Sequence, residues 1–106
     1  MDLTKYTRRK SIEVNVGATV IGGNHPIAVQ SMTNTATADV ESSVAQIVRI
    51  ADAGAPIVRL TAQGKKEGVA LADIVSRVRE EGYTTAIVAD IHFVPEIASI
   101  AAEAVD

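Results

Sequence analysis

Residues 56–91, "PIVRLTAQGKKEGVALADIVSRVREEGYTTAIVADI", hold two short β-branched runs separated by a helical pattern. The runs are "PIVRLT" and "AIVADI", each of the length and composition of a buried strand. Gly82 supplies a stop after the helical part. That part carries one apolar stripe, at Leu71, Ile74, Val75 and Val78. The stretch therefore predicts a strand, a covering helix and a second, parallel strand.

The same unit recurs along the chain. A third run, "PIAVQS", begins at residue 26, so the three runs start 30 residues apart, at 26, 56 and 86. A helical pattern separates the first two runs, and another follows Pro95 after the third run. Before the array, "SIEVNVGATVIGG" predicts two short strands joined around Gly17 and Ala18. We expect one domain over 1–106, with a hairpin at about 11–22 and βα units at about 26–54, 56–82 and 84–106.

Strand and helix alternation with apolar strands places the chain in the α/β class, with a parallel sheet covered by helices. A doubly wound open sheet and a (β/α) barrel both fit this pattern. The loop "SMTNTATAD" has no glycine-rich phosphate turn, and "AQGKKEG" lacks P-loop spacing, which weakens nucleotide binding. Polar residues end each apolar run, as at the active-site face of a barrel. We therefore predict a partial TIM barrel, because three units cannot close a barrel of eight.

Composition excludes several classes of function. The formal net charge of −3 argues against a general nucleic-acid surface, which needs clustered Lys and Arg. No stretch reaches the roughly 20 apolar residues of a membrane helix, and "MDLTKYTRRK" lacks the apolar segment of a signal peptide. The chain has no cysteine and hence no thiolate metal ligand. We expect a cytoplasmic protein that binds neither nucleic acid nor membrane.

Three charged or titratable residues stand out at the strand ends. Arg59 lies between two apolar neighbours, where a guanidinium needs either an anionic ligand or a salt bridge, for which Asp90 is a candidate. Asp90 and His92 are two positions apart on one strand and share a face. They could form an acid–base pair or contribute to a metal site, or Asp90 could bind a loop backbone beside a structural histidine. The spacing alone is weak support for a metal.

Other polar residues have simpler interpretations. The hydroxyl-rich loop at 33–37 could bind a polar ligand, although capping of the next helix by Thr37 or Asp39 is the safer interpretation. The two lysines at 65–66 are expected in a solvated loop after the second strand. His25, in the turn before the first strand, is expected at the opposite end of the sheet from Asp90 and is interpreted as structural.

Three segments add a resemblance to a known family: "RRKSIEVNVGATVIGGNHPIAVQSMTNTATADV", "AGAPIVRLT" and "VADIHF". In this order they resemble the N-terminal region of the GcpE/IspG family of 4-hydroxy-3-methylbut-2-enyl diphosphate synthases. The resemblance implies the opening of an N-terminal TIM barrel. Such enzymes reduce 2-C-methyl-D-erythritol 2,4-cyclodiphosphate to 1-hydroxy-2-methyl-2-(E)-butenyl 4-diphosphate in the non-mevalonate isoprenoid pathway.

The resemblance also implies cofactors and partners. The family uses a 4Fe-4S cluster, held by three cysteines and a glutamate in a C-terminal domain and reduced by ferredoxin or flavodoxin. Its members are homodimers in which one subunit's barrel presents substrate to the other subunit's cluster domain. By this resemblance the chain is the substrate-holding side, without the rest of the barrel or the iron-sulfur domain. It should bind no cluster and should not turn over alone.

Site residues carry over by position. Arg59 matches a basic position that binds the diphosphate, and Asp90 and His92 match catalytic positions facing the substrate. Ser31 and Asn34 lie in a matching segment and are expected to contact substrate. Two alternatives stay open: a pterin-binding barrel similar to dihydropteroate synthase, which needs no cluster, and a non-catalytic isolated subdomain. The latter would expose apolar edges and faces, which predicts self-association.

Overall fold

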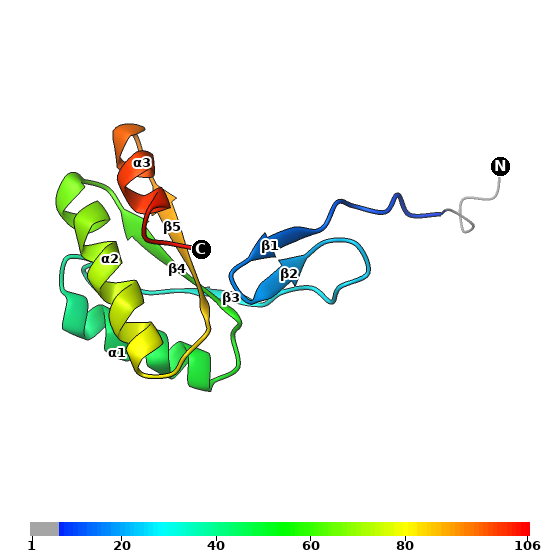
Figure 1. Cartoon of the computed structure of the whole chain (residues 1–106), viewed down its shortest axis with the longest axis horizontal. Helices are drawn as coiled ribbons and strands as arrows, with labels where there is room; N and C mark the ends of the chain where they lie inside the picture. The colour runs from blue at the N-terminus through cyan, green and yellow to red at the C-terminus, as the bar shows by residue number, and fades with distance from the viewer. Residues whose placement is uncertain (1–6) are drawn as a thin grey trace.

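The computed structural model describes residues 7–106, in which two small sheets and three helices follow one another along the chain (Figure 1). Residues 1–6 lie outside this range. They belong to "MDLTKYTRRK", the stretch in which the sequence predicted no signal peptide. The elements are β1 (Val14–Val16), β2 (Thr19–Ile21), β3 (Gln30–Met32), α1 (Val40–Asp52), β4 (Ile57–Ala62), α2 (Lys65–Glu80), β5 (Ala86–Ile91) and α3 (Glu96–Ala102). The predicted α/β class is confirmed.

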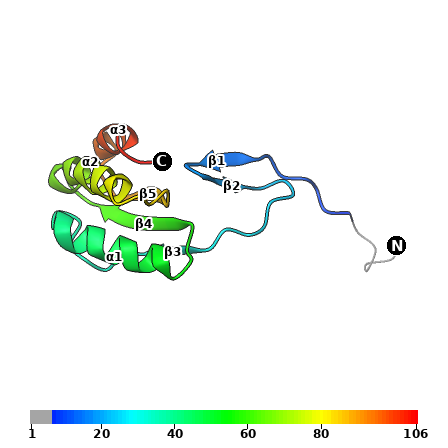
Figure 2. The same cartoon turned by 60° about the horizontal axis from the view of Figure 1, so that its bottom comes forward.

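The main sheet has the order β3-β4-β5, and both pairings are parallel. Strand order thus follows chain order, and the helices form a neighbouring layer in which α2 packs between α1 and α3 (Figure 2). Alternate strand residues join the helices in one core, which includes Val58, Leu60 and Ile87. All three helices therefore cover the same face, whereas a doubly wound sheet has helices on both.

The apolar stripes predicted from the sequence form the core. Ile47 of α1 and Leu71, Ile74 and Val78 of α2 are fully buried. The sequence offered Thr37 or Asp39 as the N-cap of α1, and the structure shows that it is Asp39. The Asp39 carboxylate accepts a hydrogen bond from the Ser42 backbone N–H at 3.2 Å. Among the described helices none is long and apolar enough to cross a membrane.

The start of α2 corrects one expectation. Lys65 and Lys66 were expected in a loop, but they form the first turn of α2, directly after the extended N-cap Gly64. Lysine is a good helix former, and nothing between residues 65 and 80 interrupts the helix. Both lysines are exposed, so they lie on the solvated surface that the sequence indicated.

The first parallel strand is also shorter than predicted. The run "PIAVQS" suggested a strand from Pro26, but β3 begins at Gln30, the residue that pairs with the first residue of β4. Ile27 is 96% exposed and Val29 is 63% exposed. Because β3 is an edge strand, its outer side has no neighbour to extend the pairing or to bury these side chains.

The predicted hairpin is present and lies at the amino end of the main sheet. β1 and β2 pair antiparallel through a two-residue turn in which Gly17 has φ 56°, a conformation that glycine adopts readily. A Cβ at Gly17 would stand 3.3 Å from the Ala86 Cβ, so the turn packs closely on the start of β5. The hairpin therefore touches the amino end of the sheet at its turn, while the rest of it projects away from the sheet (Figure 1).

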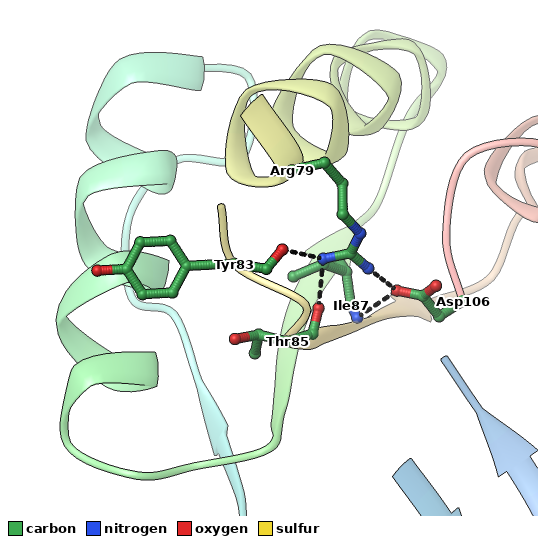
Figure 3. A network of polar contacts seen from close by, with 5 residues as sticks. All are labelled: Arg79, Tyr83, Thr85, Ile87 and Asp106. Carbon is green, nitrogen blue, oxygen red and sulfur yellow. Dashed lines mark hydrogen bonds and ion pairs between the residues drawn. The ribbon is translucent and has the colours of Figure 1, made fainter. Parts of the chain in front are cut away.

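A polar clamp ties the last residue to the same end of the sheet (Figure 3). The Arg79 guanidinium donates to the Tyr83 and Thr85 carbonyls, at 3.2 and 2.7 Å, and pairs with the Asp106 carboxylate at 2.5 Å. Asp106 also accepts from the Ile87 N–H at 2.9 Å and donates its own N–H to the Ile87 carbonyl at 3.0 Å. No local pattern in the sequence indicates this clamp, because Asp106 lies 27 residues from Arg79 in the chain.

Candidate functional site

The candidate site lies at the carboxyl ends of β4 and β5, on the face that the helices leave open. Parallel pairing aligns Arg59 with Val88 and Thr61 with Asp90. Since alternate residues share a face, Arg59, Thr61 and Asp90 all project away from the core residues Val58 and Leu60. The register thus gathers on one face the polar residues that interrupt the apolar strands.

Asp90 joins the other two predicted residues into a chain of contacts. Its Oδ2 lies 3.2 Å from Arg59 Nη2, and its Oδ1 lies 3.0 Å from His92 Nε2. The Asp90 side chain is 16% exposed, whereas Arg59 and His92 are 39% and 41% exposed. The structure therefore brings Arg59, Asp90 and His92 together and shows the Arg59–Asp90 salt bridge anticipated as an alternative. The other alternative, in which Asp90 binds a loop backbone, is not what the structure shows, because the Asp90 carboxylate contacts these two side chains.

The electrostatics of the site favour an ionised Asp90. The hydrogen bond from His92 lowers the pKa of the Asp90 carboxyl below its model-peptide value of 3.8, and the hydrogen bond and charge of Arg59 add to this, while partial burial opposes it. When Nε2 of a neutral imidazole donates to Asp90, Nδ1 is left as an acceptor. His92 can therefore carry a proton beside a fixed negative charge.

Arg59 has unused hydrogen-bonding capacity. Within residues 7–106 its Nε is buried and lacks a hydrogen-bond partner, whereas the side chain as a whole is 39% exposed, so its outer N–H groups can be reached from solvent. A buried donor without an acceptor is costly, and a guanidinium edge matches the paired oxygens of a phosphate or carboxylate. Arg59 can therefore accept an anionic ligand while it retains its contact with Asp90.

The predicted loop residues are placed differently from one another. Asn34 is held by Gln46 of α1, whose Oε1 accepts from the Asn34 N–H at 2.8 Å and whose Nε2 donates to Asn34 Oδ1 at 2.7 Å. Ser31 pairs with Val58 and so lies on the helix side of β3, away from Arg59. Substrate contact by Ser31 and Asn34 stays a prediction. The sequence did not single out Gln46, because one glutamine on a helix carries no signal of its own.

Thr37 anchors the same loop to the sheet. Its hydroxyl donates to the Thr61 carbonyl at 2.7 Å, and the side chain is 3% exposed. Thr35 and Ser43 share a hydroxyl contact at 2.9 Å. The hydroxyl groups of this loop thus bind it to α1 and β4. Thr37, the other residue predicted as a cap, instead binds a carbonyl of β4.

The strand carrying Asp90 ends in a tight turn. Phe93 has φ 65°, and the Val94 N–H donates to the His92 carbonyl at 2.8 Å, which closes a three-residue γ-turn. A side chain in the left-handed region costs roughly 1–2 kcal/mol. The Phe93 ring is 99% exposed, with its centroid 5.9 Å from that of the His92 ring. The turn directs the chain from the site into α3 within a few residues.

A hollow of about 460 Å³ lies at the opposite end of the sheet. It is formed by the hairpin and the segment before β3, and its lining includes His25, Gly22 and Ile57 but none of Arg59, Asp90 and His92. His25 Nε2 lies 3.5 Å from Glu13 Oε1, at the end where the sequence placed it. The chemistry of the strand ends, rather than the size of this hollow, identifies the candidate site.

Metal binding has no support within the part of the chain that the structure describes. Residues 7–106 contain no group of three or more His, Asp or Glu side chains able to hold a metal ion. The sequence has no cysteine, so an iron-sulfur cluster bound by thiolates does not fit the residues of this chain. Any such cluster must be held by residues outside it.

A parallel sheet wound in one direction, with helices on one face and a polar cluster at its carboxyl end, defines an α/β protein of the kind that binds small molecules at its strand ends. Within that class the chain belongs to the GcpE family, because the family described as "GcpE TIM-barrel domain" matches residues 11–106. The family membership suggested by the three quoted segments is thereby confirmed, and the pterin-barrel alternative loses its basis.

Three curated relatives are named as 4-hydroxy-3-methylbut-2-en-1-yl diphosphate synthases. The chain is 54% identical over 97% of its length to 4-hydroxy-3-methylbut-2-en-1-yl diphosphate synthase (flavodoxin) of Phocaeicola vulgatus. It is 52% identical to the protein of that name from Bacteroides fragilis. It is 45% identical over 98% of its length to the chloroplastic, ferredoxin-named synthase of Arabidopsis thaliana. The chain spans only 17%, 16% and 14% of these three relatives, respectively.

Proposed function

We propose that this chain is the substrate-binding opening of a 4-hydroxy-3-methylbut-2-en-1-yl diphosphate synthase, an oxidoreductase of the non-mevalonate isoprenoid pathway. The observation that carries the proposal is the Arg59–Asp90–His92 cluster on the open face of the sheet, in a chain of the GcpE family. The reaction consumes two electrons and two protons, opens the ring of the cyclodiphosphate and releases one water.

The sheet is proposed to be an arc of a TIM barrel. Its strands run in chain order with all helices outside, and β3 and β5 each have one free edge to which further strands can add. Under this proposal the hairpin at about 11–22 closes the amino end. The βα units at about 26–54, 56–82 and 84–106 are then the first three of eight. The open face becomes the barrel interior.

Arg59 is proposed to bind the diphosphate. Its side chain is 39% exposed, which supports this role, because phosphate oxygens could meet the accessible N–H groups of the guanidinium while Nη2 stays on Asp90. Asp90 then acts as a positioning residue for Arg59 as well as a partner of His92. Further positive charge would have to come from strands beyond this chain.

Asp90 and His92 are proposed to act on the hydroxyl side of the substrate. The ionised Asp90 can accept a hydrogen bond or hold the imidazole in place, and His92 can deliver a proton to an oxygen that leaves as water. Asn34 remains a proposed substrate contact, oriented by Gln46. Ser31 lies on the helix side of β3, and the open-face site gives its predicted substrate contact no support. These roles match the demands of the reaction, which needs a proton donor beside a fixed anion site.

The electrons are proposed to come from outside this chain. Flavodoxin or ferredoxin is the proposed donor, through a 4Fe-4S cluster in another part of the protein, and the working unit is proposed to be a cytoplasmic homodimer. The chain has no cysteine for such a cluster. It should therefore hold substrate without turnover when isolated.

The test is anaerobic turnover of the cyclodiphosphate by the complete protein that carries this chain, with reconstituted cluster and dithionite. Arg59→Ala should raise KM at least tenfold, because one charge-assisted diphosphate contact is lost. Arg77→Ala, at an exposed position of α2, is the matched control and should behave as wild type. An inactive, fully reconstituted wild-type protein would refute the proposed function.

A further inference from the structure

Phe93 is the one residue near the site whose conformation and exposure both lack an explanation within the chain. Among residues 7–106 it is the only non-glycine residue with positive φ. Strain of this kind is usually offset by packing, yet the ring is 99% exposed. A glycine would adopt the turn without strain, so neither backbone preference nor the core accounts for an aromatic residue here.

The position of the ring suggests its use. The γ-turn at His92, Phe93 and Val94 sets the Phe93 ring beside the imidazole of His92, at 5.9 Å between centroids and tilted by 46°. His92 in turn contacts Asp90. The ring therefore stands at the edge of the cluster, where it adds an apolar surface next to the imidazole that contacts Asp90.

We propose that Phe93 is a specificity-determining residue whose ring packs against the carbon skeleton of the substrate. This inference rests on the proposed function. The cyclodiphosphate presents phosphate, hydroxyl and hydrocarbon groups. Arg59 is proposed to bind the phosphate and the Asp90–His92 pair the hydroxyl groups, which leaves the hydrocarbon part without a partner. A bound ligand that covers the ring would remove apolar surface from water at the moment of binding, which offsets the strain in the complex rather than in the free protein.

The experiment is calorimetric titration of the complete protein with two ligands, the cyclodiphosphate and inorganic diphosphate. Phe93→Gly removes the ring and relaxes the turn, and Phe93→Asn does the same with a residue that tolerates positive φ. Phe93→Leu keeps apolar bulk. Val69→Ala, which trims an exposed apolar side chain of α2, is the control.

For both Phe93→Gly and Phe93→Asn we expect the Kd of the cyclodiphosphate to rise about tenfold, the size expected for loss of one apolar contact. The Kd of inorganic diphosphate should change less than twofold, and Tm should not fall. Phe93→Leu should recover most of the affinity, and Val69→Ala should match wild type.

Two results would overturn the role of Phe93. One is cyclodiphosphate binding by both Phe93→Gly and Phe93→Asn within twofold of wild type. The other is an equal loss of affinity for both ligands, which would indicate a disturbed Arg59 site rather than a lost apolar contact. Wild-type protein that binds no cyclodiphosphate would instead overturn the proposed function, and this is seen before any substitution is compared.

Discussion

Asp90 is the residue on which the candidate site depends, because it alone contacts both other members of the cluster. One oxygen faces Arg59 and the other faces His92. Loss of the carboxylate would free the arginine and the imidazole at once, whereas loss of either partner leaves one contact intact. At this scale the sequence proposed Arg59, Asp90 and His92 as site residues, and the structure shows that their side chains lie in contact.

The first prediction concerns the pKa of Asp90. His92→Ala should move this pKa up toward 3.8, because the hydrogen bond from His92 is the largest cause of the lowering. Carbon-detected NMR titration of the Asp90 carboxyl measures it. An unchanged pKa in His92→Ala would show that Nε2 does not bind Asp90 in solution.

The second prediction concerns stability against pH. Because the folded pKa of Asp90 lies below the unfolded value of 3.8, Asp90 contributes stability that is present above 3.8 and lost as pH falls through the folded pKa. Asp90→Asn should therefore lower Tm near pH 6 but flatten the fall in Tm below pH 4. Thermal unfolding from pH 2.5 to 6 measures this. Asp73→Asn, at an exposed position of α2, is the control and should leave this curve as in the wild type.

At the scale of elements, local sequence signals predicted the boundaries of α1 correctly but predicted too long a strand at β3. Asp39 caps α1 and Gly54 follows its end with φ 103°, so both helix boundaries were readable from neighbouring residues. The bounds of β3 depend instead on where β4 can pair with it. No property of "PIAVQS" itself encodes that limit, because strand pairing is a contact between distant parts of the chain.

The third prediction tests the cap. Asp39→Ala should make the Ser42 amide exchange with solvent about fivefold faster, because this amide loses its side-chain acceptor. Asp39→Asn should remain close to wild type, since asparagine caps as well as aspartate. Amide hydrogen exchange followed by NMR gives both rates. Equal protection in Asp39→Ala would mean that the first turn of α1 is held by packing alone.

At the scale of the whole molecule, the structure is more extended than a closed domain. The radius of gyration is 16.1 Å, against about 13 Å for a compact chain of 100 residues. The hairpin and the preceding arm project from the sheet (Figure 1), and the longest dimension is 55 Å. Long-range polar contacts such as the Arg79 clamp hold the ends of the helical layer onto the sheet.

The fourth prediction concerns that clamp. Arg79→Met should lower the free energy of unfolding by about 1–3 kcal/mol, because the Thr85 carbonyl and the Asp106 carboxylate lose their donor. Arg77→Met, two residues earlier on the exposed side of α2, should change it by less than about 0.5 kcal/mol. Denaturant unfolding of the dilute chain measures both. Equal effects would show that the clamp adds nothing to stability.

The fifth prediction concerns the free edges and the open face. The isolated 106-residue chain should self-associate, with a mass by light scattering above its monomer value of 11.1 kDa. Ile27→Lys with Val29→Lys should reduce the association, because charged side chains block edge pairing. A wild-type chain that stays monomeric at high concentration would count against an open barrel arc.

Sequence patterns alone predicted the class of fold, the order of strands and helices and the buried stripes, and they proposed Arg59, Asp90 and His92 as site residues. Those features follow from side-chain periodicity and from residues next to one another in the chain. The tertiary structure was needed to show that all helices cover one face, that Asp90 is the partner of Arg59, that Gln46 holds Asn34, and that β3 is short. Each of these features depends on segments that are separated in sequence, and their contacts depend on register and packing, which no local pattern encodes.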